Sequence, residues 1–398
     1  MKKKILYLSF YDFNGGAAIA AYKFFKLIPK NKYDVDFYCY KKFLNNPAVK
    51  ELQFTFLSYS KFLFNFSISR LIFFFTPLKE KQKRSLCIFS TGALARIDLK
   101  KYDIIHYHWI FNELISIHEM LSFKKKIIIT IHDLWFLNGS THYNSENVNF
   151  LTKILEKFLK KNKIEKLKKK KNLTITTPSL WTHTQFAKKL KNTNIKIIPN
   201  DGRLITKKKI KHISDKNEKI YLRNKYNLPV DEFIGLINFD QKNVNIKGYD
   251  LLNKILTKLN KLDKIKYLMI FGKGTEELDF KKFSNLIFLN LGFVDYNVMS
   301  EIYRLGDITL LPSRQETYSQ IVSESIDMNV PVVTFDNSGQ VELYNHKING
   351  YKAKAFDCND FIKGILYFYN KKTNSLFKKN INYNKLNRLN KLIRNLYD

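Results

Sequence analysis

The feature that most constrains this chain is a regular alternation of short apolar runs with amphipathic segments. A short apolar run bounded by polar residues predicts a buried strand, and the amphipathic segment after it predicts a helix covering the sheet. Strands separated by helices lie parallel in one sheet, so the alternation indicates a doubly wound α/β architecture. In the front half we expect strands over Ile5–Phe10, Asp34–Tyr40, Ile104–His108, Ile127–His132, Thr174–Thr177 and Ile195–Ile198, with helices over Ala17–Leu27 and Phe150–Lys171.

The alternation is interrupted between Arg203 and Lys219, where Lys, Asp, Asn and Ser replace the apolar signal. This composition is typical of a linker between domains. The 398 residues also exceed the roughly 250–300 at which one core stops growing, so two domains are expected. Beyond the linker we expect strands over Phe233–Asn238, Lys266–Phe271, Leu286–Leu289, Ile308–Leu311 and Pro331–Phe335, and helices over Tyr249–Leu259, Asn297–Leu305 and Ser319–Met328.

The tail is rich in Asn and Lys but carries Leu386, Leu389, Leu392 and Leu396 at helical spacing, which predicts a closing helix. The predicted parts of the chain are therefore a first domain over 1–203, a linker over 204–219, a second domain over 220–375 and a C-terminal helix over 376–398.

The charge is strongly unbalanced, because 69 Lys and Arg face 35 Asp and Glu for a formal net charge of +34. Such a surface attracts polyanions, whether nucleic acid, anionic lipid headgroups or sugar nucleotides. Lysines spread over solvated faces by compositional bias are the alternative explanation. The sequence shows no zinc finger, RNP-like motif or recognition helix, so we expect no nucleic-acid partner.

The cysteines and the apolar stretches indicate the cellular compartment in which we expect the protein. Cys39, Cys87 and Cys358 are far apart and lack paired spacing, which favours neither a disulfide framework nor a zinc site and fits a reducing cytoplasm. The basic start is followed by too short an apolar run for a signal peptide. Charged residues interrupt the stretch 54–78, so no membrane-spanning helix is expected.

The segment 311–333 has the most chemical content. A strand ends at Pro312, and a helix opens near Ser319, whose hydroxyl can cap it. The amides of Tyr318, Ser319 and Gln320 would then point at an anion together with the positive end of the helix dipole. A diphosphate suits that position.

Two carboxylates flank this predicted anion site. Glu316 lies just before the turn, and Glu324 falls in the second turn of the helix. A carboxylate beside an anion is useful where it accepts hydrogen bonds from hydroxyls, which sugars and riboses supply.

This segment resembles the donor site of the retaining family-4 glycosyltransferases of GT-B fold, whose mark is a Glu, seven residues and a second Glu, here Glu316 and Glu324. The stretches that begin at Tyr7, Asp103 and Thr130 resemble the branch that builds exopolysaccharide and other surface glycans. The likeness spans about residues 4–370. Further motifs in the family's order are Leu291-Gly-Phe-Val-Asp, Ile302-Tyr-Arg-Leu-Gly-Asp, Val330-Pro-Val-Val, Ile348-Asn-Gly-Tyr, Thr177-Pro-Ser-Leu-Trp and Ile198-Pro-Asn.

The resemblance implies two Rossmann-like domains that face each other across a cleft, with the closing helix crossing back. It implies an acceptor-binding domain over 1–203 and a nucleotide-sugar-binding domain over 220–375. The implied reaction is retaining transfer of a hexose-like sugar from a UDP- or GDP-sugar to a saccharide or lipid-linked acceptor in surface polysaccharide synthesis. Neither a cofactor nor a catalytic metal is expected.

The resemblance also assigns roles to residues. Glu316 orients the donor sugar, Glu324 holds the ribose, and His132 contacts the sugar near the reacting carbon. Lys247 matches the family's Lys beside the leaving diphosphate, but the Arg expected five residues earlier is replaced by Lys242, which lacks the bidentate fork of Arg. A relative that binds sugar nucleotides without turnover is therefore one alternative.

Several of these residues also have a purely structural interpretation. Gly15 and Gly16 permit close approach of a helix start to a phosphate, or serve a turn made only for packing. His132 could be a satisfied core residue. His106 and His108 point the same way from one strand, but without further ligands nearby we expect no metal there.

The stretches Phe54–Phe75 and Lys153–Lys171 mix aromatic or apolar residues with Lys, a pattern that suits a membrane interface. The alternative is a pair of amphipathic helices that cover their own core. A cytoplasmic protein is expected, with a peripheral position on anionic lipid at the inner face of the membrane as a further option. The rival from another class is a non-enzymatic basic protein that binds anionic membrane or nucleic acid.

Overall fold

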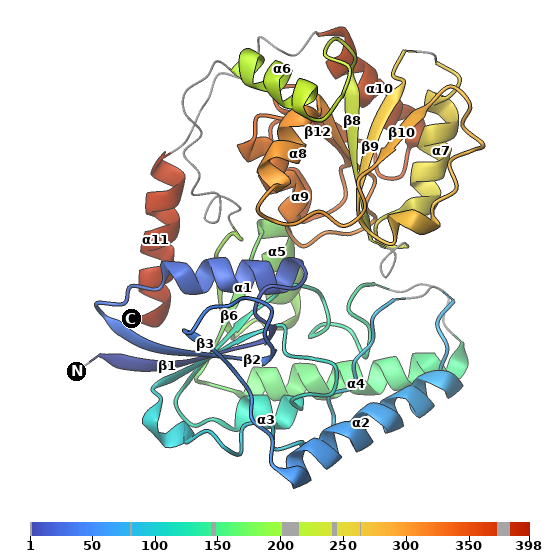
Figure 1. Ribbon diagram of the computed structural model, residues 1–398. Coiled ribbons are helices and arrows are strands. Elements are labelled where there is room, and N and C mark those ends of the chain that lie inside the picture. The colour runs from blue at the N-terminus through green and yellow to red at the C-terminus, as the bar shows by residue number, and fades with distance from the viewer. Residues whose placement is uncertain are drawn as a thin grey trace. The chain divides into compact units, whose positions relative to one another are not determined.

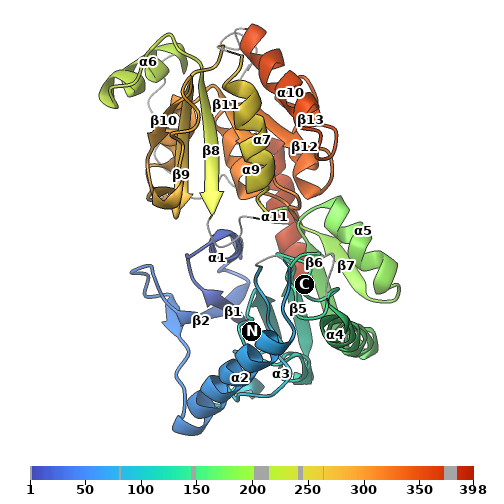
Figure 2. The same cartoon turned by 90° about the vertical axis from the view of Figure 1, so that its right-hand side faces the viewer.

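The computed structural model describes residues 2–79, 82–144, 149–200, 215–240, 245–262, 264–371 and 383–398. The chain forms two compact units, one made of Met1–Asn200 with Tyr383–Asp398 and the other of Asp201–Asn382 (Figure 1 and Figure 2). Each unit is built around its own parallel β-sheet.

The first unit holds a seven-stranded sheet in the order β3-β2-β1-β4-β5-β6-β7. Alternate residues of β1 enter different buried clusters: Leu6 and Leu8 join one, and Ile5 and Tyr7 join the other. Both faces of the sheet are therefore covered, as expected for parallel strands. The strands are β1 (Lys3–Tyr11), β2 (Tyr33–Lys41), β3 (Val49–Glu51), β4 (Ile104–His108), β5 (Lys126–Thr130), β6 (Leu173–Thr177) and β7 (Asn194–Ile197), and the helices are α1 (Gly16–Leu27), α2 (Phe56–Phe75), α3 (Ile117–Ser122), α4 (Phe150–Lys169), α5 (Leu180–Lys189) and α11 (Tyr383–Tyr397).

The second unit holds a six-stranded parallel sheet in the order β10-β9-β8-β11-β12-β13. Its faces are again both buried, because Ile237 and Ile270 pack in one cluster while Leu236 and Met269 pack in another. The predicted pair of doubly wound domains is confirmed. The strands are β8 (Ile234–Asp240), β9 (Tyr267–Lys273), β10 (Ile287–Asn290), β11 (Ile308–Leu311), β12 (Val332–Phe335) and β13 (Gly350–Ala353), and the helices are α6 (Asp215–Lys225), α7 (Tyr249–Leu259), α8 (Met299–Leu305), α9 (Gln320–Asp327) and α10 (Cys358–Asn370).

The closing helix α11 follows the second unit in sequence but packs in the first. Ile393 and Leu396 are fully buried in the cluster beside β1 and β4. The Lys126 ammonium donates a hydrogen bond of 2.7 Å to the Leu396 carbonyl. The expected crossing back of the tail is thus confirmed. The helix begins at Tyr383, and residues 376–382 of the predicted range lie outside the described residues.

The range predicted as a linker overlaps a helix. Residues 201–214 lie outside the described residues, but the chain is helical from Asp215, at the start of α6. A polar anchor holds this helix in place of an apolar stripe: the buried Arg223 guanidinium donates to the Leu305 carbonyl at 2.9 Å and to Asp307 Oδ2 at 2.7 Å. Apolar periodicity alone therefore missed α6.

Candidate functional site

The turn between β11 and α9 has the geometry expected from the sequence. The α9 helix begins at Gln320, and Ser319 is its N-cap, with the hydroxyl accepting a hydrogen bond of 3.4 Å from the Val322 amide. Ser319 has a φ of 81°, in a region that non-glycine residues rarely adopt. Tyr318, Ser319 and Gln320 thus stand at the start of a helix that directly follows a strand end.

Glu316 and Lys247 form an ion pair beside this turn. Lys247 Nζ donates a hydrogen bond of 2.7 Å to Glu316 Oε1. Burial acts to lower the pKa of Lys247, but the charge and hydrogen bond of Glu316 outweigh it and raise that pKa above its usual value. The ammonium therefore stays charged at neutral pH.

The backbone of Glu316 is fixed from both sides. Its amide donates 2.9 Å to the Ser338 hydroxyl, and its carbonyl accepts 2.8 Å from the Gly339 amide. These contacts come from the segment that follows β12. The backbone of Glu316, in the loop after β11, is therefore fixed by the neighbouring loop at the same edge of the sheet.

The position of Lys247 depends on the glycine that follows it. Gly248 has a φ of 68° and caps α7, and a Cβ built on it would lie 2.1 Å from the Pro312 carbonyl oxygen. Only glycine fits where the two backbones approach this closely. The Arg314 amide also donates 2.7 Å to the Ile246 carbonyl, which joins the two loops. Lys242, predicted beside Lys247, lies outside the described residues.

Glu324 accepts hydrogen bonds from two tyrosines that the sequence did not single out. The Tyr296 hydroxyl donates 2.9 Å to Oε1, and the Tyr303 hydroxyl donates 3.2 Å to Oε2. Burial raises the pKa of both phenols, and the carboxylate charge raises it further, so both remain donors. Glu324 therefore already performs the chemistry expected of it, which is accepting bonds from hydroxyl groups.

Among the first-unit candidates, His132 lies just beyond the end of β5, which stops at Thr130 rather than at His132 as the sequence suggested. Its Nε2 lies 3.1 Å from His108 Nδ1. Burial lowers the pKa of His132 to about 4. The ring is therefore neutral at pH 7, when it can donate from one nitrogen and accept at the other.

His106 is a satisfied core residue. Its Nδ1 lies 2.6 Å from the Tyr397 hydroxyl of α11, and its Nε2 lies 2.7 Å from the Thr130 hydroxyl. Because both ring nitrogens are engaged, the strand residues His106 and His108 do not present a ready pair of metal ligands.

The loop after His132 is held by a buried polar network. Asp133 Oδ2 accepts 2.6 Å from the Trp109 indole and lies 2.7 Å from His142 Nδ1. Burial would raise the pKa of Asp133, but His142 and the other donors lower it below the usual value. The Lys163 ammonium donates to the Trp135 carbonyl and lies 3.5 Å from that residue's ring centroid, and burial lowers its pKa to about 7. No sequence signal identified the contacts of Trp109 and Lys163, which lie 24 and 28 positions from their partners in the chain.

Gly15 lies between β1 and α1, and Gly16 is the first residue of α1. Gly15 is the N-cap with a φ of 89°, and its carbonyl accepts 3.0 Å from the Ile19 amide. A Cβ added at Gly15 would meet no heavy atom within 4 Å, so the conformation and not the packing requires glycine there.

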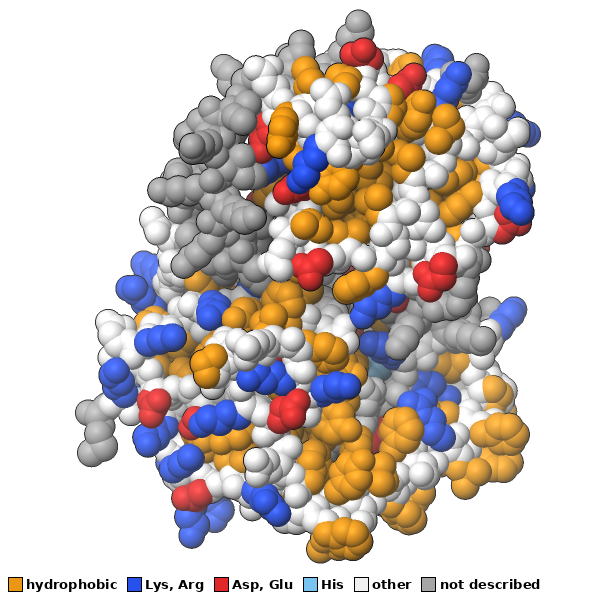
Figure 3. All heavy atoms as spheres, in the orientation of Figure 1, with side chains coloured by type: hydrophobic (Ala, Val, Ile, Leu, Met, Phe, Trp, Pro, Cys, Tyr) orange, Lys and Arg blue, Asp and Glu red, His pale blue; other side chains and the backbone are white. Residues whose placement is uncertain are grey.

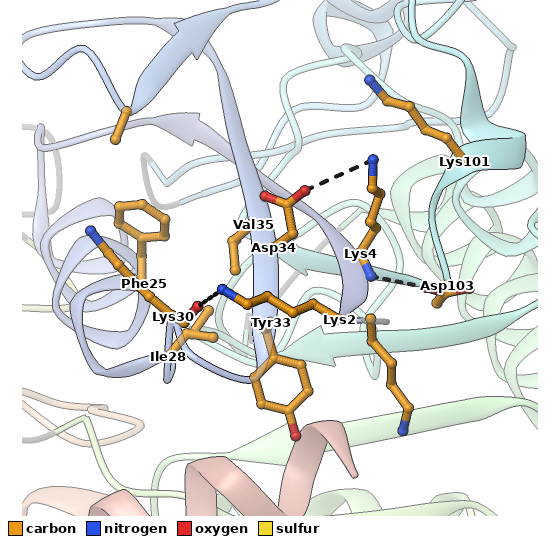
Figure 4. Close-up of a pocket in the computed structure, with 12 residues that line it drawn as sticks. Lys2, Lys4, Phe25, Ile28, Lys30, Tyr33, Asp34, Val35, Lys101 and Asp103 are labelled. Carbon is orange, nitrogen blue, oxygen red and sulfur yellow. Dashed lines mark hydrogen bonds and ion pairs between the residues drawn. The ribbon is translucent and has the colours of Figure 1, made fainter.

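A separate hollow lies at the opposite edge of the first sheet, where β1 and β2 begin (Figure 4). It contains five lysines together with Asp34 and Asp103, and Lys4 Nζ lies 3.9 Å from Asp34. None of the predicted site residues lines it. The candidate site is thus associated with the carboxyl ends of the strands, as is usual for doubly wound sheets.

Comparisons with solved structures agree with the fold. The chain aligns with a sucrose-phosphate synthase from Thermosynechococcus elongatus over 100% of its length and 99% of that chain, with a TM-score of 0.63 and 14% identity. It aligns with Anabaena HepE in complex with UDP and glucose over 99% of its length and 98% of that chain, with a TM-score of 0.64 and 14% identity. The fold is GT-B.

A family model matches part of the second unit. Residues 233–371 match the model described as glycosyl transferases group 1. An uncharacterized 41.2 kDa protein in the cps region of Klebsiella pneumoniae is 23% identical over 68% of this chain and 72% of its own length. A glycogen synthase from Pseudothermotoga lettingae is 28% identical over an alignment that covers 43% of this chain and 38% of that enzyme. The GT-B segment that carries Glu316, Glu324 and Lys247 is thus the one the family model matches.

Proposed function

We propose that this GT-B protein is a retaining glycosyltransferase that moves a hexose-like sugar from a UDP- or GDP-sugar to a saccharide or lipid-linked acceptor in surface polysaccharide synthesis. The observation that carries the proposal is the Lys247–Glu316 pair beside the start of α9. The solved complex of HepE with UDP and glucose supports a nucleotide-sugar donor, and the cps-region relative supports a role in surface glycans.

The leaving diphosphate sets the main chemical demand. A glycosyl bond breaks more easily when the charge that develops on the departing phosphate is stabilised by groups already in place. The amides of Tyr318, Ser319 and Gln320 at the start of α9 and the Lys247 ammonium are such groups. With this positive charge supplied by the chain, we propose that transfer proceeds without a catalytic metal.

The remaining residues orient the donor. Glu316 would accept hydrogen bonds from the transferred sugar, while its ion pair with Lys247 keeps that ammonium charged. Glu324 would hold the ribose. His132 would contact the sugar as a neutral ring, and the helix start at Gly15 and Gly16 would approach a phosphate. We assign acceptor binding and these two donor contacts to the first unit, and the other donor contacts to the second.

Thermal stabilisation by a panel of UDP-, GDP- and ADP-sugars tests the donor assignment, because a ligand that binds only the native state raises the melting temperature with concentration. We expect a UDP- or GDP-sugar to stabilise the protein and Glu324→Gln to weaken that effect. Glu232→Gln is the matched control, since this exposed side chain precedes β8 at the other edge of the sheet. Stabilisation by none of the donors would refute the proposal.

Product analysis tests turnover and stereochemistry. Incubation with the stabilising donor and a set of saccharide and lipid-linked acceptors should yield a glycoside with the anomeric configuration of the donor. A product of inverted configuration would refute the retaining assignment. Donor binding without transfer to any acceptor would instead favour a sugar-nucleotide-binding relative that lacks turnover. Vesicle or nucleic-acid binding without donor binding would favour the non-enzymatic rival.

A further inference from the structure

Most of the large apolar residues of the α2 helix face outward, whereas three of its polar residues face the domain. Three of its four buried residues are polar, namely Ser58, Asn65 and Ser69, with Phe62 as the fourth. By contrast, Phe56 is 90% exposed and Phe74 is 76% exposed. This reverses the usual arrangement of a surface helix. Most aromatic residues of α2 therefore do not cover the core, which was the alternative considered for this stretch.

Polar contacts satisfy the side of α2 that faces the domain. Ser58 and Thr55 form a reciprocal capping box at the start of the helix. The Asn65 amide donates 3.1 Å to the Phe89 carbonyl, and the Ser69 hydroxyl donates 2.8 Å to the Phe66 carbonyl. Rolling the helix to bury its aromatic residues would turn Asn65 toward solvent and leave the Phe89 carbonyl without this donor, so the Asn65 contact favours the outward apolar face.

The apolar surface continues onto the start of α4. Phe150 is 76% exposed and Phe158 is 62% exposed. The Thr152 hydroxyl donates 3.1 Å to the Pro77 carbonyl, which joins the start of α4 to the end of α2. We name the exposed apolar side chains of α2 and of residues 150–158 the aromatic face. In Figure 3, hydrophobic side chains gather at the lower right, where Figure 1 shows these two helices.

The charges beside the aromatic face have one sign. Lys61 and Arg70 on α2 and Lys153 and Lys157 on α4 are exposed, and α2 contains no Asp or Glu. The nearby Glu156 is half-buried and engaged with Arg84 at 3.6 Å. An apolar surface flanked by cations alone complements an anionic lipid interface.

We propose that the aromatic face docks this protein on an anionic lipid bilayer, with the aromatic rings among the headgroups and the cations on lipid phosphates. Among the described residues, no helix is long and apolar enough to cross a membrane, so the contact is interfacial. A second copy would bring the same lysines against each other, and like charges oppose such pairing. This inference is separate from the proposed reaction, because vesicle binding is measured without donor or acceptor.

The test is cosedimentation of the full chain with vesicles of phosphatidylcholine alone or with one third phosphatidylglycerol. We expect at least tenfold tighter binding to the anionic vesicles, weakening as salt rises. The variant Phe64→Ser/Phe74→Ser/Phe75→Ser should lose at least tenfold in binding at an unchanged melting temperature. Phe293→Ser is the matched control, since this ring in the second unit is 70% exposed, and it should bind like the parent.

Two further variants separate the contribution of the lysines from that of the aromatic rings. Lys61→Glu/Lys153→Glu/Lys157→Glu should lose the preference for anionic lipid. Phe64→Trp should show a blue-shifted emission on anionic vesicles and not in buffer. Equal binding to both vesicle types, or unchanged binding by the triple Ser variant, would overturn the proposal. So would a concentration-dependent dimer that the triple Ser variant abolishes while vesicles bind neither protein, because the face would then be a contact between copies.

Discussion

Lys247 Nζ lies 2.7 Å from Glu316 Oε1, although 69 positions separate the two residues in the chain. Both side chains are largely enclosed, with 22% and 13% of their surfaces exposed. Removing either partner leaves the other charge unpaired in a partly dry site, which is costly. The pair therefore links the proposed sugar-orienting carboxylate to the proposed diphosphate-binding cation.

Replacing Lys247 tests the cation directly. Lys247→Met should lower kcat by about 10²- to 10³-fold, as expected when one preorganised charge is removed from a developing anion. Lys247→Arg should retain part of the activity, because the charge remains. Steady-state kinetics at saturating donor measure the effect. Equal activity of Lys247→Met and the parent would contradict the assignment.

The two carboxylates should differ in their effects. Glu316→Gln should mainly lower kcat, whereas Glu324→Gln should mainly raise the donor KM, by about tenfold for a loss near 1.4 kcal/mol. Tyr296→Phe should resemble a mild form of Glu324→Gln, since it removes one of the donors that hold that carboxylate. Calorimetry with the nucleoside diphosphate provides the binding constants. Unchanged kinetics in both Gln variants, at saturating and subsaturating donor, would remove the site assignment.

Gly248 and Gly292 offer a matched pair of substitutions. Both have positive φ, at 68° and 62°, but a Cβ on Gly248 would lie 2.1 Å from the Pro312 carbonyl oxygen while one on Gly292 would meet nothing within 4 Å. Gly292→Ala should cost about 1 kcal/mol of backbone strain, and Gly248→Ala clearly more. Urea unfolding of both variants measures the difference. Equal losses would show that the loops of Lys247 and Pro312 are not in close contact.

Because His132 is neutral in the folded chain, we predict that the free energy of unfolding depends on pH. Its pKa of about 4 lies below the usual histidine value near 6.5, so the unfolded chain takes up a proton before the folded one does. The free energy of unfolding should fall as the pH drops from about 6.5 to 4. His132→Asn should show a shallower fall when urea unfolding is compared at pH 7.5, 6.0 and 5.0. Parallel curves for the two proteins would mean that His132 titrates normally.

The hydroxyl of Tyr397 should anchor the crossing helix. It lies 2.6 Å from His106 Nδ1 in a fully buried position, and Tyr397→Phe leaves that nitrogen without its partner. We expect a loss of about 1–3 kcal/mol in the free energy of unfolding. Tyr221→Phe, at a ring that is 64% exposed, is the control and should change little. A stability equal to the parent would indicate that the Tyr397 hydroxyl does not help to hold α11.

The sequence by itself determined most strands of both sheets, although β3 and β13 were not predicted. The range Ile104–His108 was predicted as a strand, Tyr249–Leu259 as a helix and Ile308–Leu311 as a strand, and all three match to the residue. Strands buried on both faces must be apolar throughout, and the helices between them must carry an apolar stripe, so the pattern is local and readable. The Ser319 cap was equally readable, because it involves residues three apart.

Only the tertiary structure decided which side chains meet. The Lys247–Glu316 pair, the Tyr303–Glu324 and Tyr397–His106 contacts and the Trp109–Asp133 bond join residues at least 21 positions apart in the chain, and no local pattern encodes those distances. The helix α6 was missed because the buried Arg223 anchors it through backbone carbonyls. The outward aromatic face of α2 was also undecidable from periodicity, since the same sequence could turn either side inward. Which side is buried depends on the partners that the rest of the domain offers, here the Phe89 carbonyl for Asn65.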